Sequence, residues 1–404
     1  MEVEELFLFF SALLLCSSYY WLIYPLILFI SSLVMRIMRN SEDNMKKCSC
    51  KDSYSSDYKV AIVIPTFGKR AAIINKLKLI DKILEYRELN KYIQKIYIVF
   101  SEPDDHILKK VYHVKDTMKN YKKIEIITER KRRGKAAAIN LALRRITKDL
   151  GNRTIVIVND DDAFFDAKTL QNIILTMIRD EQVAVASVFP KYQSKFLNIL
   201  YGYKRLIHKL ESMLCNPATI AGEMLAFKLD IIGSFYEETL SEDFQLGMIC
   251  SSKNKRIALL EGNVVEPYPS TFHGLVSRTE RTVLGTIMEV KRLLKKIENV
   301  KCKFIYVSYL YSLLSLPIST ISLILLIFIS TYILLSQAAS HIMFLSSLML
   351  IVVLVIAIVK RIRNFVYRFL LFILSINYGI LKALIRVLMS NKMEVVAIWK
   401  ETKV

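Results

Sequence analysis

The chain reads Thr154-Ile155-Val156-Ile157-Val158-Asn159-Asp160-Asp161-Asp162 at the point where a run of β-branched side chains leads into three carboxylates. β-branched residues favour extended backbone, and a run that is apolar on both faces is typical of a strand buried in a parallel sheet. In open α/β sheets, ligands bind at the carboxyl ends of the strands. The stretch therefore predicts a central strand that ends in an acidic site.

The acidic triplet has two interpretations. Side chains alternate along an extended chain, so Asp160 and Asp162 can point the same way. Their oxygens suit Mg²⁺ or Mn²⁺ carrying a diphosphate. Aspartates also end strands simply as turn formers, and the triplet alone does not decide between the two.

Short apolar runs alternate with longer amphipathic stretches between residues 59 and 300, which predicts an α/β fold with a mostly parallel sheet. We predict strands at Lys59–Ile64, Lys95–Phe100, Lys123–Ile127, Thr154–Val158 and Val183–Val188. We predict helices at Lys69–Glu88, Asp104–Met118, Gly134–Ile146, Lys168–Arg179, Phe196–Leu214, Glu242–Ser251 and Ser277–Ile297.

Three apolar segments flank or follow this region without a charged residue, namely Leu6–Met35, Phe304–Ser340 and Ile342–Val359. Each approaches or exceeds the roughly 20 residues that cross a bilayer, so three membrane spans are predicted. The first is too long, and its start too acidic, for a cleaved signal peptide, so we expect it to be retained.

Basic residues after the first span and after the third place the intervening domain in the cytoplasm of a multi-pass protein of the cell membrane. Residues 365–390 have a short uncharged centre between basic residues. They favour an interfacial helix over a fourth crossing, although the crossing stays open. Pro317 is expected to divide an interfacial lead-in from the second span.

The predicted organisation is an N-terminal membrane helix (1–37), a linker (38–58), a cytoplasmic domain (59–300), two membrane helices (301–361), and an interfacial or fourth membrane helix with a tail (362–404). The net charge of +20 is explained by membrane lipids and phosphate-bearing substrates without invoking nucleic acid. The six cysteines show no disulfide framework or zinc spacing, which suits the cytosol.

Further motifs stand at predicted strand ends and helix starts. Val63-Ile64-Pro65-Thr66-Phe67 ends a strand with a proline. The segment Arg130–Arg133 leads through Gly134 and Lys135 into a helix start, where backbone N–H groups favour phosphate. Ser241-Glu242-Asp243 offers either a capped helix or a general base. Arg278 and Arg281 are either exposed helix charges or cations for a leaving diphosphate.

Taken together, these motifs resemble the membrane-integrated family 2 glycosyltransferases of GT-A fold, the group that contains cellulose, chitin and hyaluronan synthases. Arg133-Gly134-Lys135-Ala136-x-Ala138-x-Asn140 resembles the RGKxxAxN signature, Asp160 and Asp162 the DxD positions, and Asp243 the last place of the TED motif. The resemblance implies donor contacts at Arg133, Lys135 and Asp160, metal contacts at Asp160 and Asp162, and a catalytic base at Asp243. Gly222 resembles the glycine of the acceptor stretch.

The chain departs from this family at several places. Glu102 stands where an aspartate pair reads the nucleobase, and Gly68-Lys69 stands where Asn-Glu is common. Arg281-Thr282 retains only the arginine of the QxxRW motif, whose tryptophan stacks on the acceptor sugar in polysaccharide synthases. Threonine has no aromatic face, which argues against processive extension.

The resemblance implies an inverting transfer of a sugar from a nucleotide-sugar donor, for which we expect a UDP-sugar, to a lipid-linked or membrane-associated acceptor. Asp243 takes the acceptor proton, Arg281 stabilises the leaving group, and Pro65, Glu102, Glu242 and Arg278 contact substrates. A processive polysaccharide synthase that translocates its product is the first alternative. A non-catalytic membrane scaffold with a transferase-like domain is the second.

Overall fold

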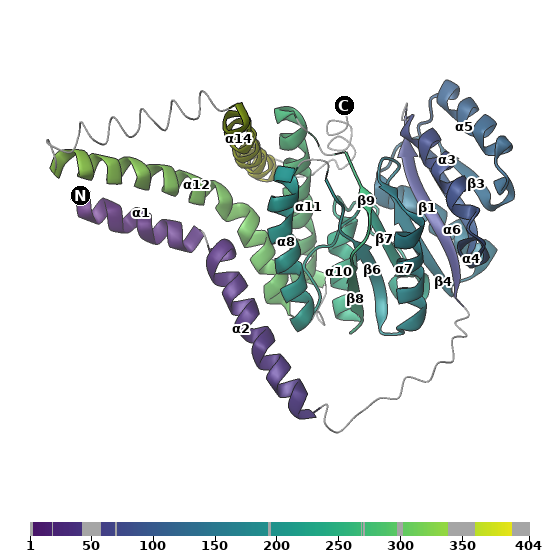
Figure 1. Cartoon of the computed structure of the whole chain (residues 1–404), viewed down its shortest axis with the longest axis horizontal. Helices are drawn as coiled ribbons and strands as arrows, with labels where there is room; N and C mark the ends of the chain where they lie inside the picture. The colour runs from purple at the N-terminus through teal and green to yellow at the C-terminus, as the bar shows by residue number, and fades with distance from the viewer. Residues whose placement is uncertain are drawn as a thin grey trace.

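The computed structural model describes residues 3–17, 19–42, 58–68, 71–192, 195–267, 269, 271–296, 302–337 and 360–389. A seven-stranded sheet of order β3-β2-β1-β4-β7-β6-β8 lies at its centre (Figure 1). Its strands are β1 (Lys59–Phe67), β2 (Ile93–Ser101), β3 (Ile124–Glu129), β4 (Thr154–Asn159), β6 (Val183–Val188), β7 (Met224–Lys228) and β8 (Arg256–Leu260). A second, two-stranded sheet pairs β5 (Phe164–Phe165) with β9 (Val264–Val265).

The predicted mostly parallel α/β sheet is confirmed, with one exception. β7 runs antiparallel to both of its neighbours, β4 and β6. The sequence did not predict β7, because its five buried residues form a run too short to identify by periodicity. The antiparallel direction brings the start of β7 to the edge where β4 ends, since Asn159 pairs with Met224.

Helices cover both faces of the sheet: α3 (Ala72–Leu84), α4 (Arg87–Tyr92), α5 (Asp105–Thr117), α6 (Lys135–Leu150), α7 (Ala167–Arg179), α9 (Leu229–Ile232) and α10 (Glu242–Ser252), with the 3-10 turn Tyr121–Lys123 before β3. One core joins α3 and α7 to the face of β1 that carries Val60, Ile62 and Ile64. The other joins α6 to Ala61 and Val63. Burial on both faces explains why these strands read as continuous apolar runs.

A helical part packs beside this layered domain and consists of α1 (Val3–Ser17), α2 (Tyr19–Glu42), α8 (Lys195–Leu214), α11 (Phe272–Lys296), α12 (Lys303–Gln337) and α14 (Lys360–Met389). The predicted first span, Leu6–Met35, is divided between α1 and α2. α12 continues through Pro317, so the proline does not end the helix, and the division between an interfacial lead-in and the span stays a prediction. The predicted third span, Ile342–Val359, lies outside the described residues.

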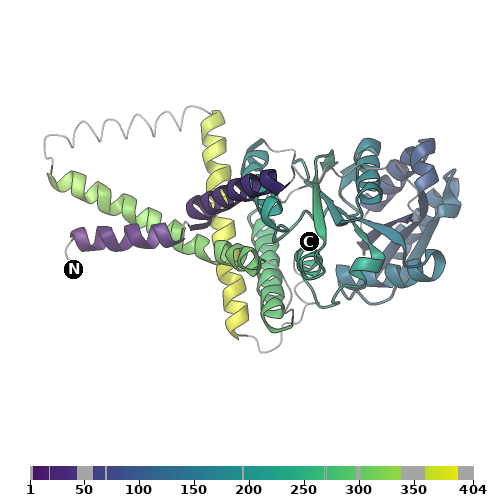
Figure 2. The ribbon, with the colours of Figure 1, turned by 90° about the horizontal axis from the view of Figure 1, so that it is seen from below.

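Two helical stretches of the described chain are long and apolar enough to cross a membrane, Lys303–Thr331 and Val366–Met389. α1 packs along α12, and both extend away from the sheet (Figures 1 and 2). α14 instead lies alongside α11 at the side of the layered domain and crosses α12 (Figure 2).

α14 is fixed to α11 by close packing and by charge. A Cβ added at Gly379 would lie 2.8 Å from Thr279 Cβ and 2.9 Å from the carbonyl oxygen of Val276, so only glycine allows this approach. The buried Glu280 carboxylate pairs with Lys382 at 3.0 Å and with Arg386 at 2.9 Å. The basic residues that interrupt the apolar stretch 365–390 therefore serve, in part, to hold α14 on the domain.

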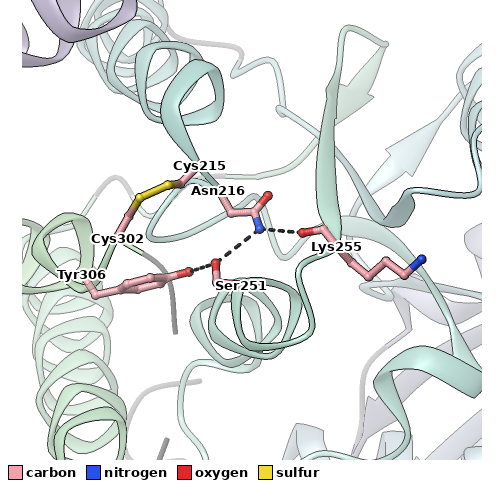
Figure 3. Close-up of a disulfide and its surroundings, with 6 residues drawn as sticks. All are labelled: Cys215, Asn216, Ser251, Lys255, Cys302 and Tyr306. Atoms are coloured by element: carbon pink, nitrogen blue, oxygen red, sulfur yellow. Dashed lines mark hydrogen bonds between the residues drawn. A yellow bond between two sulfur atoms is a disulfide. The ribbon is translucent and has the colours of Figure 1, made fainter. Parts of the chain in front are cut away.

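A disulfide between Cys215 and Cys302 joins the end of α8 to the start of α12 (Figure 3). The expectation of no disulfide is therefore wrong. The two cysteines are 87 positions apart, and only the fold brings their Cα atoms to 6.5 Å. The adjacent Asn216 amide donates to Lys255 and Ser251, and Ser251 Oγ lies 2.7 Å from Tyr306 Oη of α12. These contacts fix α12 to the sheet domain.

Because this disulfide closes a long loop, Cys215→Ser should lower the free energy of unfolding by about 2–5 kcal/mol. Thermal unfolding in detergent with and without dithiothreitol measures the effect. Reductant should destabilise the wild-type protein and leave a Cys215→Ser/Cys302→Ser double variant unaffected. A wild-type melting temperature that ignores reductant contradicts the pairing.

Candidate active site

The carboxyl ends of β1, β2 and β4 meet at one edge of the sheet and form a pocket with the start of α6. Thr66 Oγ1 of β1 donates a 2.6 Å hydrogen bond to Asp161 Oδ2 after β4. The pocket is lined by Pro65, Thr66, Phe67, Ser101, Arg132, Gly134, Lys135, Ala138, Asp160 and Asp161. The residues predicted from strand ends and from the basic loop therefore come together.

The three aspartates differ in their surroundings. Asp161 is buried against Thr66, whereas Asp160 and Asp162 are only partly buried. Beneath them, the fully buried Lys76 of α3 donates to Asn159 Oδ1 at 2.5 Å and to the carbonyl oxygen of Ala163. Burial lowers the pKa of Lys76 to about 8, against the opposing effect of the three carboxylates. Lys76 thus supports the turn that carries the triplet.

Lys135 is the central cation of the site. Its Nζ lies 2.8 Å from Asp160 Oδ1, 2.5 Å from Glu242 Oε1 and 3.2 Å from the carbonyl oxygen of Gly222. Burial lowers the pKa of this ammonium, but the two carboxylates outweigh burial and raise the pKa overall. Lys135 therefore joins the end of β4 to the start of α10, although the two are about eighty residues apart in sequence.

In the basic loop before α6, some residues line the pocket and others stabilise the loop itself. Gly134 has φ +115°, a conformation that side chains disfavour, and it lets the loop turn into the helix. The Arg132 guanidinium lies 3.7 Å from the centre of the Phe67 ring, and its backbone N–H donates to Glu102 at 3.1 Å. Arg133, which we had chosen from the sequence, instead pairs with Glu129 and Glu237 at the surface.

Asn140 of the same motif has a structural role. Its side chain donates to the carbonyl oxygen of Phe235 at 2.8 Å and accepts from the N–H of Phe235 at 2.9 Å. This pair fixes the segment that leads to α10 against α6. The motif thereby positions Glu242 and Asp243 relative to Lys135.

Asp243 is held at the first turn of α10. Thr219 Oγ1 donates to its Oδ2 at 3.0 Å, and the N–H of Phe244 donates to its Oδ1 at 2.9 Å. Burial, and then the negative charge of Glu242, raise the pKa of Asp243 above that of an ordinary aspartate. A raised pKa makes this carboxylate a better proton acceptor than an ordinary aspartate. Gly222 lies beside it, where a Cβ would stand 3.8 Å from Asp243 Cβ.

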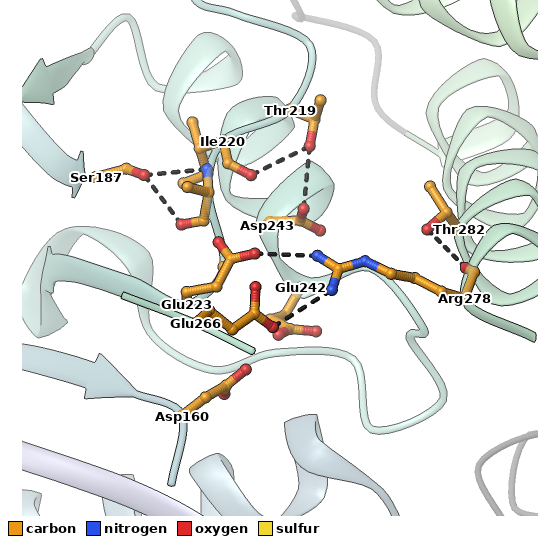
Figure 4. A network of polar contacts seen from close by, with 12 residues as sticks. Asp160, Ser187, Thr219, Ile220, Glu223, Glu242, Asp243, Glu266, Arg278 and Thr282 are labelled. Carbon is orange, nitrogen blue, oxygen red and sulfur yellow. Dashed lines mark hydrogen bonds and ion pairs between the residues drawn. The ribbon is translucent and has the colours of Figure 1, made fainter. Parts of the chain in front are cut away.

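An arginine of α11 enters the same site, where Glu223, Glu242 and Glu266 gather between Asp160 and Asp243 (Figure 4). Arg278 pairs with Glu223 at 3.2 Å and with Glu266 at 3.4 Å. Burial, and then Glu223, raise the pKa of Glu266 to about 8. Arg281 is half-buried, three residues further along α11.

Sequence reasoning missed Lys76, Glu223 and Glu266. Glu223 stands directly after Gly222, in the stretch that we had singled out for its glycine. Lys76 was visible as a lysine among the buried positions Ile73, Leu77 and Ile80 of an amphipathic helix. Glu266 follows the short strand β9 and carries no motif, so only the tertiary structure reveals it.

The donor set near β4 fits a hard divalent cation that a substrate helps to hold. In the described part of the chain, no three His, Cys, Asp or Glu side chains are arranged to hold a metal ion by themselves. Mg²⁺ usually takes only one or two protein carboxylates and completes its shell with water and substrate phosphates. The partly exposed Asp160 and Asp162 match that pattern.

Replacing the central cation tests the geometry directly. Lys135→Met leaves the Asp160 and Glu242 carboxylates without their shared partner, so we expect a loss of about 3–5 kcal/mol in the free energy of unfolding. Urea denaturation in detergent measures it. Lys131→Met, at an exposed position of the same loop, is the control and should change stability little. Equal stabilities for the two variants would refute the central placement of Lys135.

Two family models match the chain. Glycosyl transferase family 2 matches residues 61–226, and Glycosyl transferase family group 2 matches residues 155–376. The first runs from β1 into β7 and includes the pocket, and the second runs from β4 into α14. No match was found among curated proteins.

One solved structure shares the fold, and others resemble parts of the chain. The mannosyltransferase PcManGT from Pyrobaculum calidifontis, in complex with GDP-Man and Mn²⁺, shares 18% identity at a TM-score of 0.63, covering 95% of this chain and 100% of its own. Glucosyl-3-phosphoglycerate synthase from Mycobacterium tuberculosis shares 14% identity (TM-score 0.38, covering 52% of this chain and 71% of its own). Mannosyl-3-phosphoglycerate synthase from Rubrobacter xylanophilus also shares 14% (TM-score 0.40, covering 61% and 78%).

The sheet is of the GT-A type, with one antiparallel strand inserted into a parallel arrangement. The family group 2 model extends over more than half of the chain and includes the acidic site, Asp243 and α11. The chain belongs to the family 2 glycosyltransferases, and the protein is a glycosyltransferase.

Proposed function

We propose that the protein is a membrane-bound, inverting glycosyltransferase that moves a sugar from a nucleotide-diphosphate sugar to a lipid-linked or membrane-associated acceptor at the cytoplasmic face. One observation carries this proposal: Lys135 pairs with both Asp160 and Glu242, which brings the acidic end of β4 and the partly buried carboxylate of Asp243 into one site. The residues proposed to bind the donor therefore lie in the same site as the residue proposed to activate the acceptor.

The donor side is the pocket at the end of β1, β2 and β4. The start of α6 offers backbone N–H groups, and Lys135 offers an ammonium, to the diphosphate. Pro65 and the ring of Phe67 with its stacked Arg132 form the walls for the nucleoside. Glu102, which accepts from the backbone N–H of Arg132, would contact it from beside the pocket. The mannosyltransferase of the same fold binds GDP-Man with Mn²⁺, and we expect a nucleotide sugar here, a UDP-sugar or a GDP-sugar.

Asp160 and Asp162 would hold Mg²⁺ or Mn²⁺. When bound, the cation supplies positive charge to the leaving diphosphate. Lys135 supports the same charge from the α6 side, and Arg278 and Arg281 supply it from α11. Arg133 is assigned to the loop's outer face, where it stabilises the turn into α6.

Asp243 acts as the general base. Thr219 and the N–H of Phe244 fix the carboxylate, which accepts the proton of an acceptor hydroxyl as its oxygen bonds to the anomeric carbon. The bond from that carbon to the diphosphate oxygen breaks in the same displacement. Attack from the side opposite the leaving group inverts the anomeric centre. Glu242 keeps Lys135 in place, and Gly222 leaves room for the acceptor.

The membrane part supports a membrane-associated acceptor. α14 is held on α11 through Glu280, and its outer side exposes Leu370, Leu374, Tyr378, Leu381 and Ile385. Such a helix suits the interface of the inner leaflet, with α12 spanning the bilayer. We therefore propose residues 1–37 and 301–361 as membrane segments, 38–58 as the linker, 59–300 as the cytoplasmic catalytic domain and 362–404 as the interfacial helix with its tail.

Single addition fits better than processive synthesis. Thr282 occupies the position of the acceptor-stacking tryptophan, and its hydroxyl donates within α11 to the carbonyl oxygen of Arg278 at 3.0 Å. The site therefore presents a small, internally bonded side chain where a processive enzyme presents an aromatic face.

The proposal is tested by incubating protein in lipid nanodiscs with radiolabelled sugar nucleotides, Mn²⁺ and an extract of lipid acceptors. Asp243→Asn should lower kcat by roughly 10²–10⁴-fold, because a general base contributes about that much. Asp116→Asn, at an exposed position of α5, should retain wild-type activity. Label that stays out of organic solvent, or transfer that survives Asp243→Asn, contradicts the proposal.

The pH profile gives an independent check. Asp243 must be ionised to accept a proton, and its pKa is raised, so kcat/KM should fall on the acid side at a pH above the ordinary aspartate value of 3.8. Because Glu242 contributes to the rise, Glu242→Gln should move this acid limb to lower pH. An acid limb that does not move speaks against Asp243 as the titrating base.

A further inference from the structure

Helix α8 carries polar side chains that the proposed mechanism leaves unused. His208 follows Lys204 by four residues and Arg205 by three, so it neighbours both on the helix surface. α8 packs on α2, where Tyr24 Oη donates to Glu211 Oε1 at 2.8 Å. α8 therefore stands between the sheet domain and α2 (Figure 1).

His208 is 1% exposed, and neither of its ring nitrogens has a hydrogen-bond partner among the described residues. Its ring lies against Phe189 with centroids 5.5 Å apart. Burial, and then Lys204, lower its pKa well below the usual value, so the ring is neutral and offers one N–H donor. A buried polar group without a partner indicates a missing ligand or water.

Arg205, one turn before His208, also has a buried nitrogen without a hydrogen-bond partner among the described residues. One guanidinium nitrogen donates to the carbonyl oxygen of Pro190 at 2.6 Å, while its buried Nε has no partner in the part of the chain that the structure describes. Its guanidinium lies 5.8 Å from the centre of the Phe189 ring. Phe189 and Pro190 directly follow β6, whose end lies at the same sheet edge as the active site.

Of these three side chains, Lys204 is the one nearest to the proposed base, Asp243. No described carboxylate forms an ion pair with its ammonium, which stands 5.9 Å from the centre of the Tyr309 ring of α12. Tyr309 in turn packs against Phe244, the neighbour of Asp243. Burial lowers the pKa of Lys204, while Asp243 is the carboxylate that opposes this most. Lys204 is partly buried, and an ammonium that has lost part of its water without gaining an ion pair is unfavourable, so a ligand that brings an anion stabilises it.

We propose that Lys204, Arg205 and His208 form an acceptor subsite that binds a phosphate group of the acceptor, next to the hydroxyl that Asp243 activates. The proposal rests on the proposed function and specifies its acceptor class. A phosphate has oxygens in several directions and can accept from donors on three side chains, which a single neutral hydroxyl cannot. The phosphate belongs either to a lipid or to a soluble phosphorylated acceptor.

Equilibrium binding tests this subsite without requiring transfer. The probes are radiolabelled dodecyl phosphate below its critical micelle concentration, dodecanol as its neutral counterpart, and glycerol 3-phosphate as a soluble phosphate, each added to protein in phosphatidylcholine nanodiscs. Lys204→Met should weaken binding of dodecyl phosphate about tenfold or more, because it removes a charged hydrogen bond. Lys204→Arg should retain most of the binding.

Lys209→Met is the matched control, since Lys209 lies on the exposed side of α8 and pairs with Glu261 at the surface. It should leave all three affinities unchanged, and Lys204→Met should leave dodecanol unchanged. Lys204-dependent binding of glycerol 3-phosphate as tight as that of dodecyl phosphate supports a soluble source, and preference for the alkyl chain supports a lipid. Equal binding of dodecyl phosphate by the wild-type and Lys204→Met proteins overturns the subsite.

Kinetics separate this proposal from a simpler role for Lys204. With a phosphorylated acceptor, Lys204→Met should raise the acceptor KM and leave the donor KM unchanged, and the loss of its positive charge should move the acid limb of the pH profile to higher pH. A shift of the acid limb to higher pH without weaker phosphate binding would overturn the subsite and leave Lys204 as a counter-charge for Asp243. Failure of the proposed function shows separately, as absence of Asp243-dependent transfer in the wild-type protein.

Discussion

The site depends on one buried ionic contact, the Lys135 ammonium between the carboxylates of Asp160 and Glu242. Two negative groups drawn from distant parts of the chain repel each other. A cation placed between them attracts both, so the net interaction of the three groups is favourable. All three side chains have lost most of their water, so each depends on the others for its charged form. The arrangement also prepares the site for a diphosphate, which can compete with the carboxylates for the same ammonium.

The fold serves this contact from both sides. β1, β4 and α6 present Asp160 and Lys135, while the antiparallel β7 delivers Gly222 and Glu223 to the same edge. Asn140 fixes the segment before α10 to α6. On the side of the helical part, Arg278 of α11 reaches Glu223 and Glu266, and the same helix holds α14 through Glu280. A single helix, α11, therefore contacts both the active site and the segment proposed to lie at the membrane surface.

The sequence predicted the features that local chemistry determines. Strands β1 to β4 and β6 were visible as apolar runs, and Pro65, Lys135, Asp160 and Asp243 were visible at their ends or at helix starts. Features that need the tertiary structure were missed: Lys76 as a buried support, Glu266 as a partner of Arg278, and the disulfide between distant cysteines. Arg133 was chosen for its motif, yet Arg132 faces the pocket, because residue spacing in a loop does not fix the direction of its side chains.

The most direct measurement is an experimental structure of the protein in a lipid nanodisc with Mn²⁺ and a non-hydrolysable sugar nucleotide. The diphosphate should lie between Lys135 and the carboxylates of Asp160 and Asp162. Asp243 should face the anomeric carbon from the side opposite the leaving group. A donor bound away from Lys135, or an Asp243 carboxylate on the same side as the diphosphate, would contradict it.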